Sequence, residues 1–168
     1  MKKQILIIVV FFIAFTGITE AQESLSKNAI GLRLGDKDDT GLGLEATYQR
    51  MVSSDNRIEL DFGWRSEDEG GLDFDLYKLT GLYHWVFGIN KGLYWYVGPG
   101  ASLRYLTFDS DFTESDSEFD LFIAGTVGIE YNFAIPLQLS FDIRPEFGVT
   151  DNTDDLEIDW GLSVRYKF

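Results

Sequence analysis

The sequence predicts an all-β protein, folded as an eight-stranded antiparallel up-and-down β-barrel. Apolar and polar residues alternate through eight segments, which is the two-residue period of a β-strand whose two faces meet different surroundings. Turn signals separate these segments, and no segment keeps a helical period. Because the segments follow one another through near-neighbour connections, a closed barrel is expected, which leaves no unpaired edge.

The first four segments are separated by short polar stretches. NAIGLRLGD and GLGLEATYQR flank an acidic loop, and the turn SSDN leads into RIELDFGWRS. The fourth segment, LDFDLYKLTGLYHWVF, follows a loop that contains two glycines. The expected strands are residues 28–36, 41–50, 57–66 and 72–87.

The last four segments follow the turn GINKG and are joined by an acidic stretch, by AIP and by DNTDD. The final segment shows the alternation best: Leu156, Ile158 and Trp160 point one way, whereas the residues between them are polar or small. The expected strands are residues 93–108, 119–133, 137–150 and 156–168.

The N-terminal segment has the features of a secretory signal peptide. Two lysines precede an apolar run that begins at Ile5, and Thr19 and Ala21 stand where a signal peptidase reads small residues. The competing interpretation is a membrane anchor, but the run is shorter than the roughly 20 residues that a spanning helix needs. We therefore expect residues 1–21 to be removed and residues 22–168 to form one barrel domain.

Composition excludes several classes of function. The chain carries a formal net charge of −14, so it is unsuited to nucleic acid, whose phosphates require clustered Lys and Arg. It contains no cysteine, which excludes disulfides and thiolate metal sites. No later segment is apolar enough for a spanning helix, so membrane insertion would have to come from strands.

Eight strands fit two barrels that are inside-out versions of each other. In a secreted soluble lipocalin-like barrel the apolar face lines a ligand cavity, whereas in an outer-membrane barrel it meets lipid. The polar face combines glycines with charges of both signs, as the crowded lumen of a small barrel would. The residues expected to form a lumen ion-pair network are Arg33, Glu59, Arg104, Glu130, Arg144 and Arg165.

Aromatic residues of the apolar face favour the membrane barrel. They gather near both ends of the expected strands, with aliphatic residues between them, and two such rings match the two interfaces of a bilayer. A ligand cavity has no reason for two rings. The expected girdle residues are Trp64, Trp85, Trp95, Tyr105, Tyr131, Trp160, Tyr166 and Phe168.

The C-terminal Tyr166-Lys167-Phe168, with apolar residues alternating back from it, resembles the C-terminal signature of outer-membrane barrels. The whole chain after the signal is similar to small eight-stranded proteins of the OmpX and OmpA-barrel type and to the outer-membrane β-barrel domain family. This resemblance implies a transmembrane β-barrel in the outer membrane of a Gram-negative cell. It also implies contact with lipid and lipopolysaccharide, and insertion by the barrel assembly machinery through Phe168.

The sequence offers little catalytic chemistry. His84 is the only histidine, and its phase places it in the lumen near the short-turn end, without an adjacent serine. A packed lumen histidine is therefore favoured over a catalytic base. An eight-stranded lumen is also just wide enough to be filled by side chains, so sustained conductance is not expected.

The acidic loops are a stronger indication of function than His84. The stretch DSDFTESDSEFD spaces oxygen-bearing side chains somewhat like a calcium loop, but Glu114 stands where such a loop needs glycine. Its candidate ligands for Ca²⁺ or Mg²⁺ are Asp109, Asp111 and Asp120, and the cation could bridge to lipopolysaccharide. The simpler interpretation is a solvated rim of mutually repelling charges.

These observations predict a small non-enzymatic outer-membrane barrel, a monomer without an obligatory cofactor. Its expected role is structural or in surface interaction through acidic extracellular loops. A secreted soluble lipocalin-like barrel that binds an apolar ligand and a lipid-modifying barrel enzyme are the two alternatives.

Overall fold

The computed structural model describes residues 25–36, 43–69, 72–110, 113–150 and 156–168, and it contains eight strands. These are β1 (Asn28–Gly35), β2 (Leu44–Met51), β3 (Asn56–Glu69), β4 (Leu72–Asn90), β5 (Leu93–Ser110), β6 (Thr113–Asn132), β7 (Leu137–Gly148) and β8 (Leu156–Lys167). The predicted signal segment, residues 1–21, lies within residues 1–24, outside the described residues. Within the described residues, no helix is long and apolar enough to cross a membrane.

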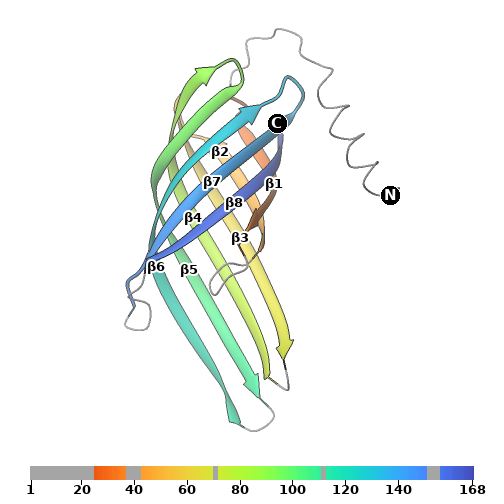
Figure 1. Ribbon diagram of the computed structural model, residues 1–168, viewed down its shortest axis with the longest axis vertical. Helices are drawn as coiled ribbons and strands as arrows, with labels where there is room; N and C mark the ends of the chain where they lie inside the picture. Colours follow the sequence, from red (N-terminus) through yellow and green to blue (C-terminus); the bar gives the residue numbers. More distant parts are fainter. Residues whose placement is uncertain (1–24, 37–42, 70–71, 111–112, 151–155) are drawn as a thin grey trace, which may run out of the picture.

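The strands form a closed barrel in chain order, which confirms the predicted fold (Figure 1). Every neighbouring pair is antiparallel, and β1 pairs with β8 from Ala29↔Lys167 to Gly35↔Gly161. The last residue extends this seam, because the Phe168 amide donates to the Asn28 carbonyl at 2.9 Å and the Asn28 amide donates to the Phe168 carbonyl at 3.1 Å. The barrel therefore has no open edge between its first and last strands.

The two ends of the barrel differ in their connections. Residues 52–55, 91–92 and 133–136 join strands at what we call the short-turn end, where the C-terminus also lies. The opposite end, here called the loop end, carries residues 36–43, 70–71, 111–112 and 149–155. Strands β3 to β6 are longer than the other four and reach beyond them at the loop end (Figure 1).

Strand β6 begins earlier than the sequence indicated. The prediction of an acidic loop over residues 109–118 is wrong in its extent, because β5 continues to Ser110 and β6 starts at Thr113. The register pairs Phe108 with Asp116 and Ser110 with Thr113. Backbone hydrogen bonds between two strands do not require apolar side chains, so the pairing continues through a polar segment that lacks the alternation used to predict strands.

Burial alternates along each strand with the period of two that the sequence predicted. In β8 the polar set is buried from Asp159 to Lys167, whereas the apolar set from Leu156 to Tyr166 is exposed. The same division holds around the barrel: charged side chains fill the inside and aliphatic side chains cover the outside. A soluble barrel with an apolar ligand cavity would need the reverse arrangement, so the lipocalin-like alternative is not favoured.

Two prolines on the outer face interrupt the strand ladders. The β4–β5 register skips from Leu82↔Gly100 to Trp85↔Val97, next to Pro99. The β6–β7 register likewise skips around Pro145. Proline has no N–H to donate, so each interruption follows from the residue type.

Candidate functional site

The centre of the lumen is an ion-pair network built on three buried arginines from β1, β7 and β8. Arg33 donates from Nη1 to Glu45 Oε2 at 3.0 Å and to Asp159 Oδ2 at 2.7 Å. Its Nη2 donates to Asp142 Oδ1 at 2.8 Å. Buried charges are tolerated only when they are paired and hydrogen-bonded, and Arg33 has three carboxylate partners.

The other two arginines continue this network across the lumen. Arg144 lies with its Nη2 2.5 Å from Asp61 Oδ2 and its Nη1 3.5 Å from Glu45 Oε2. Arg165 donates from Nη2 to Glu59 Oε2 at 3.0 Å, and Glu59 Oε1 is 3.8 Å from Arg144 Nη2. Five strands are thus joined by charged contacts through the inside of the barrel.

A second group of polar residues closes the short-turn end. Arg57 Nη1 lies 2.5 Å from Glu130 Oε2, and Arg57 Nε donates to His84 Nδ1 at 3.0 Å. The Arg57 guanidinium also stands 4.5 Å above the ring centroid of Tyr96, which is stacked on His84 at 4.7 Å. The sequence placed His84 in the lumen near this end, and its Nδ1 is held by Arg57 in a wholly buried cluster.

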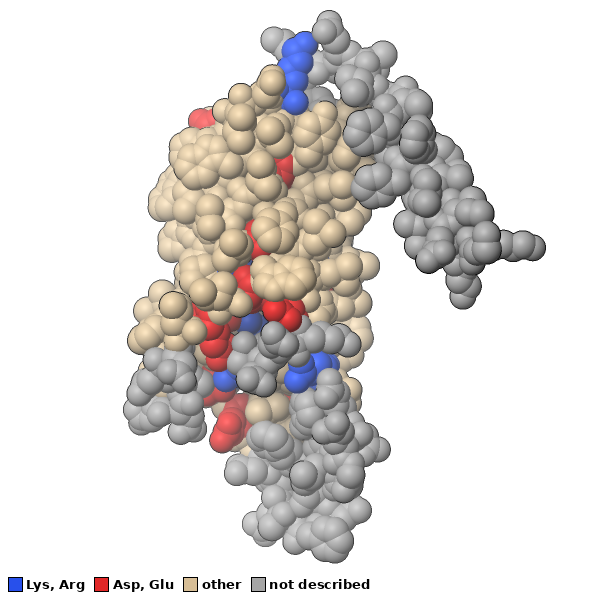
Figure 2. Space-filling model, in the orientation of Figure 1, with Lys and Arg blue, Asp and Glu red and all other residues tan. Residues whose placement is uncertain are grey.

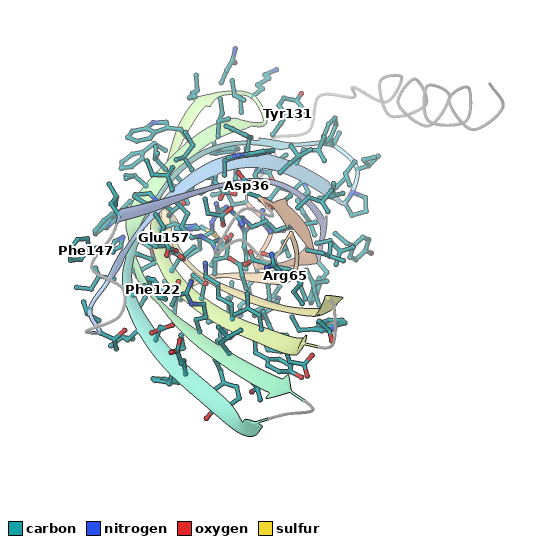
Figure 3. The ribbon with its side chains drawn as sticks, turned by 60° about the horizontal axis from the view of Figure 1, so that its bottom comes forward. Asp36, Arg65, Phe122, Tyr131, Phe147 and Glu157 are labelled. Atoms are coloured by element: carbon teal, nitrogen blue, oxygen red, sulfur yellow. The ribbon has the colours of Figure 1, made fainter. Side chains whose placement is uncertain are left out.

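A third group lies toward the loop end. Lys78 Nζ donates to Glu146 Oε2 at 2.5 Å, and Ser102 Oγ donates to Glu146 Oε1 at 2.6 Å. Farther out, Arg104 Nε donates to Asp120 Oδ2 at 3.2 Å, and Thr150 Oγ1 donates to Asp120 Oδ1 at 3.1 Å. Figure 3 looks toward this end, with Glu157, Arg65 and Asp36 directed inward and Phe147 outside the wall.

The three groups line the described part of the lumen from the short-turn end toward the loop end. The pocket at the short-turn end, lined by residues that include Leu25, Arg57 and Gln138, has a volume of about 10 Å³. That is room for about one water molecule. An eight-stranded barrel has just enough interior for its own side chains, and here these side chains are locked together by charge.

The structure separates the six residues predicted for the lumen network. Glu59, Arg144 and Arg165 lie in one cluster, to which Arg33 is joined through Glu45. Glu130 belongs to the group at the short-turn end and Arg104 to the group at the loop end. All six side chains face the inside of the barrel, with Arg104 the most exposed of them.

Arg57 and Tyr96 are lumen residues that the sequence analysis does not single out. Arg57 begins the expected strand over residues 57–66 and shares the phase of Glu59 and Asp61. Tyr96 is fully buried in the lumen and packs against the hydrogens of Gly128. The signal that identifies both is their phase: each stands an even number of residues from a charged or glycine position of the same strand.

The predicted girdle residues lie on the outer face, and aromatic side chains gather there at two levels. Trp64, Tyr77, Tyr105 and Phe119 are cross-strand neighbours that form one row over β3 to β6 near the loop end. The next row toward that end is polar, with Ser66, Asp75, Thr107 and Ser117. Aromatic side chains favour the membrane interface, so this change from aromatic to polar is where the boundary between lipid and headgroups is expected.

The second aromatic level lies at the short-turn end. Phe87 and Trp95 are stacked at 4.6 Å, and Tyr166 and Phe168 are stacked at 6.3 Å. The remaining predicted girdle residues there are Trp85, which is exposed, and Tyr131, which is half-buried. Trp160 faces outward on β8 as the register neighbour of Ile143.

The three candidate metal ligands are not brought together among the described side chains. Asp109 lies in β5, Asp111 is outside the described residues, and the carboxylate of Asp120 is buried and paired with Arg104. Within the described part of the chain no group of three or more His, Cys, Asp or Glu residues could hold a metal ion. Asp120 is thus a lumen residue by geometry.

Comparison with solved structures finds barrels that match almost from end to end. Ail from Yersinia pestis, in complex with the heparin analogue sucrose octasulfate, has a TM-score of 0.60 and 22% identity, with 85% of this chain and 97% of that chain covered. The N-terminal β-barrel domain of Pseudomonas aeruginosa OprF has a TM-score of 0.61 and 16% identity, covering 87% and 100%. Neisserial surface protein A has a TM-score of 0.57 and 16% identity, covering 84% and 94%.

These similarities concern the fold. No curated protein sequence matches the chain. The family model described as outer membrane protein β-barrel domain matches residues 8–168, which is nearly the whole sequence. Together with the apolar exterior and the charged, closed interior, this match identifies the chain as a member of the outer membrane protein β-barrel domain family.

Proposed function

We propose that this protein is a non-enzymatic barrel in the outer membrane of a Gram-negative cell, where its acidic loop end faces outward and interacts with cationic partners. The observation that carries the proposal is the distribution of charge. The buried side chains include six basic and eight acidic residues, so the lumen is nearly neutral. The excess negative charge therefore lies elsewhere.

Most of that excess belongs to segments at the loop end. Residues 36–39, 65–75, 109–118 and 151–155 contain sixteen acidic and two basic residues. In Figure 2 most of the visible acidic atoms lie toward this end, where a few basic atoms lie among them, and another basic side chain projects at the opposite end. Such a field attracts cations and repels anions over roughly a Debye length, about 8 Å at physiological ionic strength.

The closed lumen argues against transport. A pore would need the arginine, glutamate and aspartate side chains to separate, and each buried charge left without its partner costs several kcal/mol. His84 gives no support to the lipid-modifying alternative, since its Nδ1 accepts a hydrogen bond from Arg57 inside a buried cluster. With transport and lipid modification disfavoured, we infer a rigid barrel whose loop end is the part that interacts with partners.

Divalent cations are one class of partner for this end. Asp109 and Asp111 remain candidate ligands for Ca²⁺ or Mg²⁺, because carboxylates are the ligands that these ions prefer. Such an ion would bridge the acidic end to the phosphates of lipopolysaccharide. Asp120 is left out of this proposal because Arg104 and Thr150 already occupy its carboxylate.

Cationic polypeptides are the second class. The Ail structure was obtained with a heparin analogue, which is a polyanion. For the present chain we infer the opposite preference, since a polyanion would be repelled by the loop end. A lysine-rich polypeptide should bind, and the binding should weaken as salt is raised.

The test uses the purified barrel in lipid nanodiscs, with binding of a lysine-rich peptide and of heparin followed by biolayer interferometry. Replacing Asp109, Asp111, Glu114 and Asp116 together by Asn and Gln should weaken peptide binding. The matched control is Asp55→Asn, which removes one acidic charge at the short-turn end and should have little effect. Heparin binding as tight as peptide binding, or a quadruple variant that binds peptide like the parent, would overturn the proposal.

A further inference from the structure

Among the residues that the structure describes, nearly all basic side chains have partners in the protein, but two do not. The lumen arginines and Lys78 are paired with carboxylates, and Lys167 Nζ donates to the Phe133 carbonyl. Lys27 and Arg50 are exposed, and neither makes an ion pair or side-chain hydrogen bond within the described residues. These two are therefore available to a ligand outside the protein.

Arg50 is on β2 at the short-turn end, and Lys27 directly precedes β1, the neighbouring strand. The register pairs Asn28 with Arg50, and the Met51 amide donates to the Lys27 carbonyl at 2.9 Å. Beside them Tyr48 Oη donates to Asn28 Oδ1 at 2.9 Å, which fixes the polar end of an outward-facing aromatic residue. The outer face of this corner of the barrel, next to the β1–β8 seam, thus combines the Arg50 cation with a hydrogen-bonded tyrosine.

The position of Arg50 in the strand is what distinguishes it. On β2 it follows Leu44, Ala46 and Tyr48 in the outward phase, so it is the next residue beyond the lipid-facing set. Among the outward-facing strand positions whose side chains the structure describes, the charged residues are Arg50 at the short-turn end and Asp75 at the loop end. The outer wall therefore meets the lipid headgroups with a cation at one end and an anion at the other.

A cation at this depth has a defined chemical partner. Arg side chains lay their apolar stem along the hydrocarbon region and carry the guanidinium to the headgroup level. The guanidinium fork matches the oxygens of a phosphate group in a way that a single amine does not. The short-turn end of an outer-membrane barrel lies at the inner leaflet.

We propose that Arg50 forms a binding site for the phosphate of an anionic phospholipid at the short-turn rim of the barrel. The negatively charged loop end would repel such a lipid, so the site gives the barrel a preference for anionic lipid on one side only. Tyr48 contributes the aromatic surface against which the glycerol region of the lipid packs. This property is separate from the proposed interactions of the loop end.

The experiment is native mass spectrometry of the full barrel in detergent, titrated with phosphatidylglycerol or with phosphatidylcholine of the same acyl chains. We expect the parent protein to retain phosphatidylglycerol more strongly. Arg50→Gln should reduce that affinity about fivefold, since each basic residue near an anionic lipid surface contributes a factor of that order. Lys27→Gln should have a smaller effect, and Arg50→Lys should keep part of the affinity.

The matched control is Lys91→Gln, which removes a positive charge from the β4–β5 turn at the same end of the barrel. It should leave the affinity unchanged. An equal loss in Lys91→Gln would mean general charge attraction and would overturn the site, as would equal retention of the two lipids or an Arg50→Gln variant that binds like the parent. The shift in electrophoretic mobility between boiled and unboiled samples verifies that each variant is folded.

Discussion

The guanidinium of Arg33 occupies the space above Gly161, where a Cβ atom on that residue would overlap its Cζ and Nε atoms. Arg33 lies on β1 and Gly161 on the neighbouring β8. The absence of a side chain on one strand thus allows the arginine of the next strand to lie flat and reach three carboxylates. This relationship explains why glycine shares the lumen phase with charged residues in so small a barrel.

Gly161→Ala should therefore destabilise the barrel. The added methyl group displaces Arg33 from its partners, and overpacking of this kind costs about 1 to 3 kcal/mol. The measurement is the urea midpoint of unfolding in lipid vesicles, followed by tryptophan fluorescence. The control is Gly81→Ala on the outer face, where the new Cβ would meet only Leu60 Cδ2 at 3.6 Å. Equal losses in the two variants would contradict a role for the space above Gly161.

Arg144→Leu should lower stability more than Arg104→Leu. Arg144 is fully buried and faces Asp61, Glu45 and Glu59, so its removal leaves buried carboxylates without a cation, at a cost of about 3 to 5 kcal/mol. Arg104 is 12% exposed, and water can partly replace its pairing with Asp120. Unfolding midpoints of the two single variants test this order. If the Arg104 variant were the less stable of the two, the central position of Arg144 in the network would be refuted.

His84 should act as a structural acceptor for Arg57. His84→Leu leaves the buried Arg57 Nε without its acceptor, a change that costs about 1 to 3 kcal/mol. A double-mutant cycle with Arg57→Leu measures the coupling, and the double variant should lose less than the sum of the two single losses. Simple additivity would show that the two side chains do not depend on each other. Lipid A from cells that carry the His84 variant should be unchanged, because the residue has no proposed catalytic part.

The barrel should show no sustained conductance in planar bilayers. The three groups of paired charges fill the lumen, and an eight-stranded barrel has no spare width for a water column. Current recordings after insertion from detergent, with detergent alone as the control, test this expectation. Stable channels of uniform size in the parent protein would mean that the ion pairs open readily in the membrane.

Strand phase was open to prediction from the sequence because it depends only on the period of two. Arg33, Glu59 and Arg165 could be placed inside, and Trp64 and Tyr166 outside, without knowing which strands pair. The ends of the strands were harder to predict from the sequence. The ends of β5 and β6 continue through a polar acidic stretch, because each strand supplies the hydrogen-bond partners of the other and needs no apolar face there.

The tertiary structure decided which charged residues pair with each other inside the barrel. Arg33 meets Asp142, which is 109 residues away in the chain, and only the closure of the barrel brings β1 and β7 within reach across the lumen. The same closure assigns Asp120 to Arg104 and takes it away from the candidate cation loop. Arg57 forms an ion pair with Glu130 on β6, and no spacing pattern in the sequence predicts this contact.

The sequence by itself thus determined the number of strands, their order and the phase of the alternating residues within them. The tertiary structure alone decided the register around the ring, which charges meet inside it and which cations stay unpaired at its rim. The physical reason is that alternation along a strand is a local property, fixed by backbone geometry, whereas register depends on the stagger that closes eight strands into one barrel.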